Sequence, residues 1–145
     1  MSGWGRVSHR FLRCALACGV FVAAACHAQA PRIERCGEVL TLDTRSGNTL
    51  RLSFALSSGG VAASPVTLLL LAGGGGHLDL DAQGCARKLA GNSLVRSVPL
   101  FNAAGLFTAL VDAPSGFQGE DGLGGFRTDP RHAQDLGEVI AFLRT

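Results

Sequence analysis

Charged side chains are scarce in this 145-residue chain, and neither sign of charge predominates. There are 13 basic and 11 acidic side chains, but three of the basic ones, Arg6, Arg10 and Arg13, lie within the first thirty residues. The remainder carries ten basic and eleven acidic side chains. It therefore lacks the surplus of Lys and Arg that marks nucleic-acid binding, and the basic amphipathic helix of a membrane-surface protein. We expect a small molecule or another protein as partner.

Long apolar runs are also missing. The longest candidate, Cys14 to Cys26, is well under the roughly 20 residues that a membrane-spanning helix needs. Arginines precede this run and Ala28-Gln-Ala30 follows it, which is the order of a secretory signal peptide. We expect residues 1–30 to be that peptide, cleaved after Ala30, with lipidation of Cys26 as the alternative. The exported or periplasmic product is then residues 31–145, the size of one small domain.

Only two of the five cysteines, Cys36 and Cys85, lie outside the predicted signal peptide. An oxidising compartment would permit them to pair, and two cysteines allow one intramolecular bridge. They could equally be two separate buried thiols, because a free cysteine packs like a small hydrophobic residue.

Two short alternating runs, residues 38–42 and 49–56, flank the turn-forming segment Asp43–Asn48 and predict a β-hairpin. In the second run the apolar side chains share one face, and Arg51 and Ser53 take the other, which we expect to face water. The near-continuous apolar runs 66–72 and 106–111 predict strands buried on both faces of a partly parallel sheet.

Two helices are predicted after these strands. Ser97 can cap a short helix that runs to Ala104, with Pro99 in its first turn. Asp129, followed by Pro130, caps a second helix. Its apolar face has i, i+3, i+4, i+7 spacing and consists of Leu136, Val139, Ile140 and Leu143.

The predicted order of hairpin, strand, helix, strand and helix indicates an α/β fold with helices on both sides of the sheet. Ligands of such sheets bind beyond the carboxyl ends of the strands. Two unusual loops follow these ends, Gly73 to Asp81 and the glycine-rich stretch Asp112 to Phe126. The glycines of the second loop predict freedom to move.

This order of elements resembles the opening of an α/β hydrolase, whose three-layer fold it would share, and more narrowly a group of exported, poorly characterised bacterial members. The resemblance covers roughly Cys36 to Thr145. The residues that carry it are Gly91-Asn-Ser-Leu-Val-Arg96, Leu100-Phe101, Val111-Asp-Ala-Pro-Ser115, Phe126-Arg127 and His132-Ala133 with Asp135.

The resemblance implies that the loop Gly73 to His77 supplies a backbone N–H to an oxyanion hole, from Gly76 or His77. The alternative is that the four glycines only form a tight turn. The order also departs from the His-Gly-Gly-Gly arrangement of many esterases, because His77 follows the glycines here.

No G-x-S-x-G motif occurs in the chain, and Ser58, Ser93 and Ser115 do not fit one. In the family the catalytic acid and histidine come later still. We therefore expect the amino-terminal part of a hydrolase of small ester or acyl substrates, truncated before its nucleophile. The alternatives are a non-catalytic interaction protein and a decayed product. The open sheet edge predicts that the isolated mature fragment is unstable or self-associates.

Other candidate sites are weaker. Arg96 or Arg127 could hold a substrate carboxylate, although solvation or an ion pair with Asp112 is the commoner role of such arginines. Asp112 and Ser115 are two further candidate substrate-binding residues. His132, in the first turn of its helix, is expected to be exposed or to cap.

His77, Asp79 and Asp81 could bind a metal, but their spacing fits no metal motif, and the two aspartates alternate with leucines as solvated positions do. The glycine run lacks the Gly-Lys-Ser/Thr ending of a P-loop. We expect no metal and no cofactor.

Overall fold

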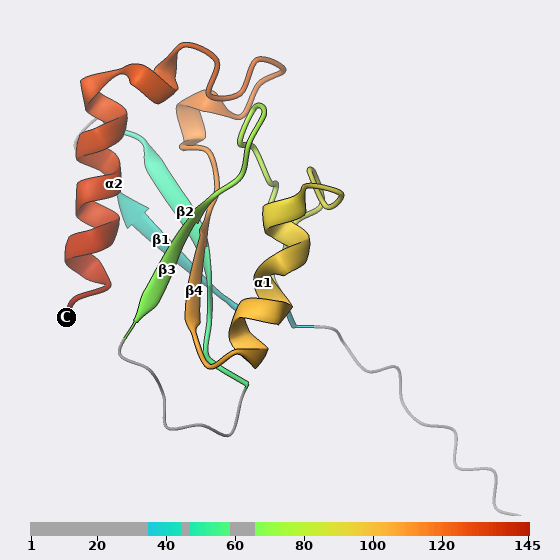
Figure 1. Cartoon of the computed structure of the whole chain (residues 1–145). Coiled ribbons are helices and arrows are strands. Elements are labelled where there is room, and N and C mark those ends of the chain that lie inside the picture. Colours follow the sequence, from blue (N-terminus) through green and yellow to red (C-terminus); the bar gives the residue numbers. More distant parts are fainter. Residues whose placement is uncertain (1–34, 45–46, 59–65) are drawn as a thin grey trace, which may run out of the picture. The chain divides into compact units, whose positions relative to one another are not determined.

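The computed structural model describes residues 35–44, 47–58 and 66–145, all within one unit, Ile33–Thr145 (Figure 1). The predicted signal peptide, with its cleavage site and the alternative at Cys26, lies outside the described residues. No helix in the described part of the chain is both long and apolar enough to cross a membrane.

Four strands form one mixed sheet in the order β1-β2-β4-β3. The strands are β1 (Glu38–Asp43), β2 (Thr49–Ala55), β3 (Thr67–Leu71) and β4 (Phe107–Val111). β2 pairs antiparallel with β1 and with β4, whereas β3 and β4 are parallel. The predicted hairpin and the predicted parallel pair are therefore confirmed.

Helices cover the two faces of the sheet, α1 (Ser93–Ala103) on one side and α2 (Pro130–Phe142) on the other (Figure 1). Beneath α2 lies an apolar cluster formed by Leu50, Leu52, Ala109, Val111 and Val139. Beneath α1 and the segment before it lies a second cluster, formed by Leu70, Ala72, Leu78, Leu80 and Leu110. Because β3 is at the edge, Leu71 remains 37% exposed, so the prediction that this strand is buried on both faces was only partly right.

The prediction that Ser53 faces water was wrong, because its side chain is buried. A methyl group added at Gly37 or at Gly84 would collide with the Ser53 hydroxyl oxygen, which shows how closely two backbone segments pack against it. One of these segments belongs to the long irregular excursion between β3 and α1, residues 72–92. This excursion therefore covers a face of the hairpin that alternation alone assigns to solvent.

Helix α1 begins five residues earlier than predicted. Its N-cap is Asn92, whose side-chain oxygen accepts a hydrogen bond from the Leu94 amide at 3.0 Å, and Ser97 lies inside the helix. Pro99 is also an interior residue and not a first-turn one. Packing of Leu94 and Val95 against the sheet makes the earlier start favourable.

Helix α2 begins as predicted. The Asp129 side chain caps it by accepting a hydrogen bond from the Arg131 amide, and Pro130 occupies the first helical position. The Arg131 guanidinium also binds this carboxylate, and these hydrogen bonds lower the pKa of Asp129 to about 2. Val139 is buried on the apolar face, but Ile140, predicted on the same face, is 40% exposed.

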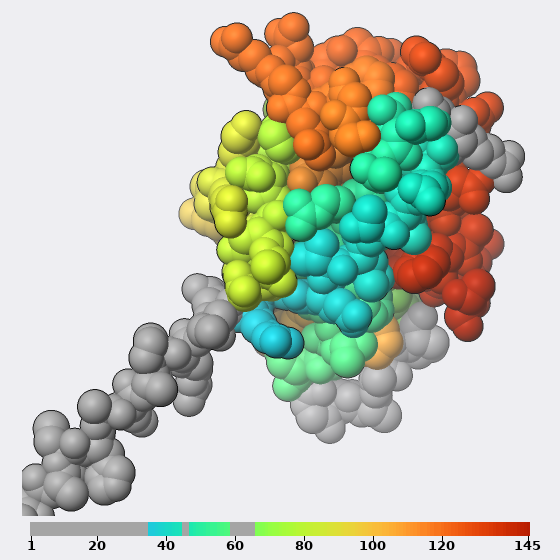
Figure 2. Space-filling view, turned by 180° about the vertical axis from the view of Figure 1, so that it is seen from behind, coloured from blue at the N-terminus to red at the C-terminus, as the bar shows by residue number. Residues whose placement is uncertain are grey.

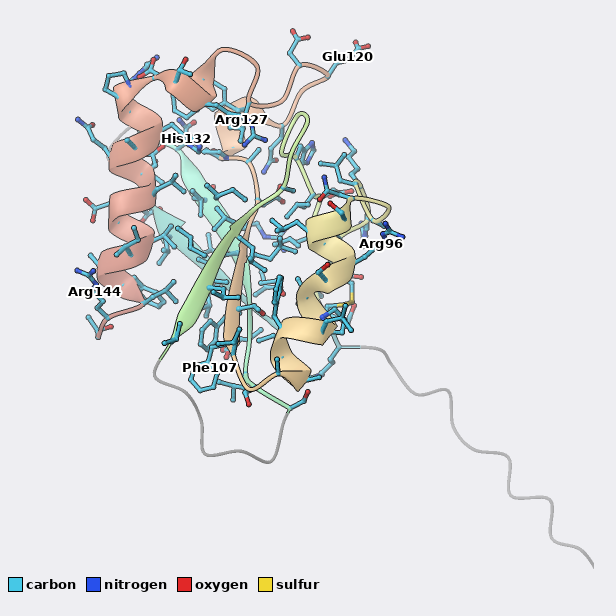
Figure 3. The ribbon with its side chains drawn as sticks, in the orientation of Figure 1. Arg96, Phe107, Glu120, Arg127, His132 and Arg144 are labelled. Atoms are coloured by element: carbon cyan, nitrogen blue, oxygen red, sulfur yellow. A yellow bond between two sulfur atoms is a disulfide. The ribbon has the colours of Figure 1, made fainter. Side chains whose placement is uncertain are left out.

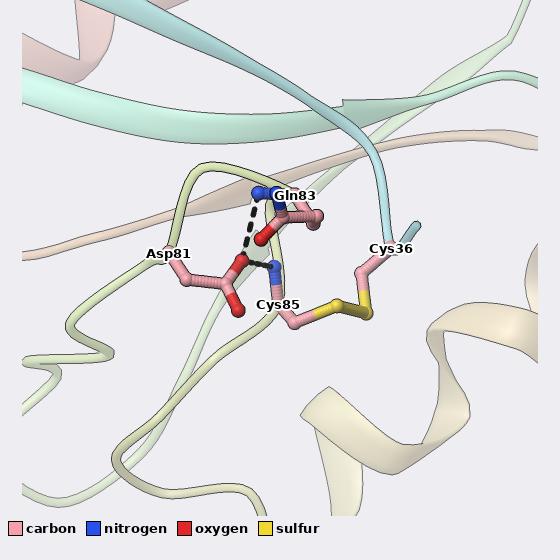
Figure 4. The surroundings of a disulfide bond; sticks show 4 residues. All are labelled: Cys36, Asp81, Gln83 and Cys85. Carbon is pink, nitrogen blue, oxygen red and sulfur yellow. Dashed lines mark hydrogen bonds between the residues drawn. A yellow bond between two sulfur atoms is a disulfide. The ribbon is translucent and has the colours of Figure 1, made fainter. Parts of the chain in front are cut away.

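A disulfide between Cys36 and Cys85 ties the start of the hairpin to the excursion (Figure 4). Asp81 shapes the turn that carries Cys85, because one carboxylate oxygen accepts the amides of Gln83 and Cys85, each at 2.9 Å. The Cys36 amide in turn donates to the Gln83 carbonyl. Figure 2 shows the result from behind, with the excursion in yellow-green lying against the strands of the hairpin in cyan.

Candidate functional site at the carboxyl ends of the parallel strands

The loop Gly73 to His77 leaves the carboxyl end of β3 and depends on glycine for its shape. Gly74 and Gly76 have left-handed φ angles of 67° and 70°, which a residue with a side chain rarely adopts. A methyl group at Gly76 would also lie 2.6 Å from a Leu123 methyl carbon and 2.8 Å from an Arg127 nitrogen. The glycine at this position therefore allows the second loop to pack directly onto the first.

Asp112, at the carboxyl end of β4, holds the segment that follows the glycines. It is 2% exposed, and one carboxylate oxygen accepts the amides of Leu78 at 2.6 Å and Ala113 at 2.8 Å. The other oxygen accepts the Leu80 amide at 3.4 Å. A buried carboxylate with this many amide donors is a fixed anchor, so we do not propose Asp112 as a substrate contact.

Arg127 holds the loop from its other side. Its Nη2 atom donates to the carbonyl oxygens of Ala72 at 2.6 Å and Gly74 at 2.9 Å. The expected ion pair with Asp112 is not formed, because the guanidinium is directed at these two carbonyls and the Asp112 carboxylate is taken by amides. Arg127 thus fixes the glycine loop through Nη2, while the residue itself is exposed.

Two amides of the loop have no protein acceptor. Within the described residues, the N–H groups of Gly75 and His77 donate to no protein atom, whereas the Gly75 carbonyl accepts the Leu123 amide at 2.8 Å. Gly76 is buried and His77 is partly exposed. The His77 ring contacts Lys88, with its Nδ1 atom 3.3 Å from the ammonium nitrogen. An unpaired amide on a rigid turn is what an anion or oxyanion site requires.

His132 lies at this end of the sheet and is 5% exposed, so the prediction of an exposed or capping residue was wrong. Its ring packs against Phe126, with 5.3 Å between the ring centroids, and its Nδ1 atom has no hydrogen-bond partner in the described structure. Burial lowers the pKa of His132, the Arg127 charge lowers it further, and Asp135 opposes both effects. The net effect is a lowered pKa, which favours the neutral form of His132.

Little space remains between these groups. A cavity of about 10 Å³ lies between Gly76, Asp112, Leu123, Arg127 and His132. That volume is close to the smallest that holds one water molecule, so it does not admit a substrate. Two larger hollows, of about 300 and 670 Å³, lie near the disulfide, and a third, of about 330 Å³, lies between the end of β1 and the end of α2. None of these three hollows reaches the glycine loop.

The remaining predicted site residues lie apart. Arg96 is on the exposed side of α1, far from Arg127 and His132 (Figure 3). The Ser115 hydroxyl accepts the Thr49 amide at 3.1 Å and so ties the loop after β4 to the hairpin turn. Of the four predicted substrate contacts, the structure places only Arg127 and Asp112 beside the glycine loop.

The suggested metal ligands do not converge. Asp81 is occupied by the amides of its own turn, and His77 contacts Lys88. No group of three or more potential metal-binding side chains occurs among the residues that the structure describes.

The apolar residues that cover this site were not predicted from the sequence. Leu123, Phe126 and His132 are buried together with Ala113, and the Phe117 and Phe126 rings stack at 3.8 Å. The apolar residues between the glycines could have indicated this packing, because a loop exposed to solvent rarely contains large apolar side chains. Three of the five glycines in residues 116–125, namely Gly116, Gly122 and Gly124, therefore permit close packing, whereas Gly119 and Gly125 have open space around them.

Comparisons of the chain with protein-family models, with curated proteins and with solved structures found no match.

Proposed function

We propose that this chain is the amino-terminal part of an exported α/β hydrolase acting on small ester or acyl substrates. The observation that carries the proposal is the glycine loop at the carboxyl end of β3, with left-handed glycines and amides that have no protein acceptor. Acyl transfer forms a tetrahedral intermediate whose oxygen carries negative charge, and preorganised backbone amides stabilise it. The strand–loop–helix–strand order around the loop also supports the proposal.

Of the two candidate donors, the proposal favours His77. Gly76 is buried beneath Leu123, whereas His77 is partly exposed. The chain is fixed on both sides of His77, because Arg127 binds the Gly74 carbonyl at 2.9 Å and Asp112 binds the Leu78 amide at 2.6 Å. A donor between two fixed residues needs no reorganisation during the reaction, which is the main advantage of such sites.

The test begins with sequencing the source DNA through the codon for Thr145. The proposal expects an apolar strand followed by G-x-S-x-G in one of the three frames. A stop codon with no such motif downstream in any frame would overturn the hydrolase assignment.

If the motif is present, the completed enzyme is assayed on short-chain esters as two matched variants. His77→Pro removes the backbone donor, and we expect it to lower kcat by about 10²–10³-fold, whereas His77→Ala keeps the N–H and retains most of the activity. Circular dichroism of both variants shows whether each is folded. Equal activity in two folded variants would exclude the His77 amide as a donor.

A second candidate function is a non-catalytic interaction protein. The cavity of about 10 Å³ at the strand ends favours it, because no substrate fits there in the described structure. This alternative predicts no labelling by a serine-directed fluorophosphonate, even for the product of the complete reading frame.

A further inference from the structure

We propose that the hollow of about 300 Å³ between α1 and the end of β2, which we call the α1 pocket, binds a small apolar carboxylic acid with a hydroxyl group at its far end. Helix α1 contributes Val95, Val98 and Pro99 to the pocket, and β2 with the residue after it contributes Ser53 and Leu56. The volume is at the lower end of the range for small-molecule sites. The inference goes beyond the proposed hydrolase function, because it concerns a separate place on the molecule.

The α1 pocket lies toward the end of the sheet opposite the glycine loop. β2 runs antiparallel to β4, so Ala55 pairs with Thr108 near the start of β4, whereas Leu52 pairs with Val111 at its carboxyl end. Ala55 lines the pocket, and no described residue of the glycine loop or of the loop after β4 does so. In Figure 1 these two loops gather at one end of the sheet, and the carboxyl end of α1 lies toward the other. Binding at the two places can therefore be distinguished.

The walls of the α1 pocket are mainly apolar. Val95 and Val98 face the cluster beneath α1, and Leu110 of β4 belongs to the same cluster. Leu56, which also lines the pocket, is 65% exposed and marks the side that is open to solvent. Apolar walls with a few polar groups are typical of small-molecule sites. The central part of the ligand should therefore be apolar.

A buried hydroxyl group without a partner lines the α1 pocket. Ser53 pairs with Leu110 across the sheet, so its side chain lies on the face that α1 covers. Ser53 is 3% exposed, and its hydroxyl makes no hydrogen bond within the described residues. Asn102 is already engaged, because its amide group donates to the Leu56 carbonyl at 2.9 Å and its oxygen accepts the Thr108 hydroxyl at 3.1 Å. Buried polar groups normally have partners, so we assign Ser53 a hydroxyl group of the ligand.

Arg35 gives the α1 pocket a positive charge. It lines the pocket, is exposed, and forms no ion pair with any residue in the described ranges. The described residues that line the pocket include no aspartate or glutamate. A guanidinium binds a carboxylate through two parallel hydrogen bonds. Because Arg35 is exposed and Ser53 is buried, the carboxylate of the ligand should lie at the mouth and its hydroxyl group at the base.

The walls of the α1 pocket are fixed without a ligand. The disulfide joins Cys36 to Cys85, and the Cys36 amide donates to the Gln83 carbonyl at 3.0 Å, which together hold the excursion against the hairpin. On the side of α1, the Ser58 amide donates to the Asn102 carbonyl at 3.0 Å. A site that is already formed does not need to be ordered when a ligand binds, which favours affinity.

The probe is 3-(4-hydroxyphenyl)propanoate, added to the full chain in low-salt buffer and followed by NMR of the backbone amides. We expect saturable shifts at Ser53 and Val98, and none at Gly75 or His77. Two matched compounds separate the polar contacts. 3-Phenylpropanoate lacks the hydroxyl group and should bind about 3–10-fold more weakly. The methyl ester of the hydroxy acid lacks the charge and should bind about 3–5-fold more weakly, because the arginine is exposed.

Two variants assign these contacts to their residues. Ser53→Ala should raise the Kd of the hydroxy acid about 3–10-fold and leave that of 3-phenylpropanoate unchanged. Arg35→Gln should raise the Kd of both acids about 3–5-fold and leave that of the methyl ester unchanged. Arg144→Gln is the control for net charge, because Arg144 lies at the end of α2 on the other side of the sheet (Figure 3), and it should change no Kd. Circular dichroism shows that each variant is folded.

Three results would overturn the proposal. The first is the absence of saturable shifts at millimolar concentrations of the hydroxy acid. The second is a set of shifts centred on the glycine loop, which would place the ligand at the candidate site. The third is equal weakening of both acids by a folded Ser53→Ala variant, which would show that the hydroxyl group does not contact the ligand. None of these results depends on whether a G-x-S-x-G motif follows Thr145, so this proposal and the hydrolase proposal can fail separately.

Discussion

Replacement of Asp112 by asparagine tests the anchor between the glycine loop and β4. The carboxylate accepts three backbone amides, two of them at 2.6 and 2.8 Å on the same oxygen. Asparagine can keep those two bonds through its carbonyl, but without the charge, which lowers each by about 1 kcal/mol. Its amide group then faces the Leu80 amide as donor to donor, so the third bond is lost.

The sum for Asp112→Asn is a loss of about 2–3 kcal/mol in the free energy of unfolding, or a fall of about 10 °C in Tm for a domain of this size. Asp112→Ala leaves three buried amides without an acceptor and should cost about 3–6 kcal/mol. Urea unfolding followed by circular dichroism, in a buffer with stabilising sulfate, measures both variants.

The matched control for this prediction is Asp121→Asn. Asp121 is an exposed aspartate of the neighbouring loop, and its carboxylate makes no hydrogen bond in the described structure. We expect its replacement to change the stability by less than about 0.5 kcal/mol. An Asp112→Asn variant as stable as this control would refute the anchoring argument.

Three further outcomes are expected. Replacing Cys36 and Cys85 together by serine releases a link across 49 residues and should lower the free energy of unfolding by about 4 kcal/mol, measured by urea titration. Gly122 has a φ of 52° and lies against a backbone carbonyl of the glycine loop, so Gly122→Ala should lower the free energy of unfolding by about 1–3 kcal/mol. Gly119 has open space around it, so Gly119→Ala should change the stability little. Equal shifts in Tm for the two variants would contradict this prediction. Because the pKa of His132 is lowered from 6.5 in the folded state, the unfolded state binds more protons than the folded state as the pH falls through and below 6.5. The free energy of unfolding should therefore decrease on acidification through this range. Urea titrations at several pH values should show a smaller decrease for His132→Gln.

The strands could be predicted because their signals are local. Apolar alternation located the hairpin, and the uninterrupted run ending at Ala72 located β3. The start of α1 was missed because Asn92 and Ser97 are both good caps, and only the packing of Leu94 beneath the helix distinguishes them. Propensity does not contain that tertiary information.

The candidate site was predicted less completely than the strands. The glycine loop and its position after β3 could be predicted, but the anchors could not, because each depends on contacts between distant residues. Arg127 binds a carbonyl 55 residues earlier, and Asp112 binds an amide 34 residues earlier. Burial of His132 likewise depends on the stacked rings of Phe117 and Phe126, which come together only in the folded loop.

The position of Asp112 along the chain also sets an order of events during synthesis. A ribosome makes Leu78 and Leu80 well before the residue whose carboxylate accepts their amides. Until β4 has been made and has paired with β3, these amides are without their buried acceptor, and the glycine loop lacks its final shape. The final shape of the glycine loop therefore depends on the pairing of β3 with β4.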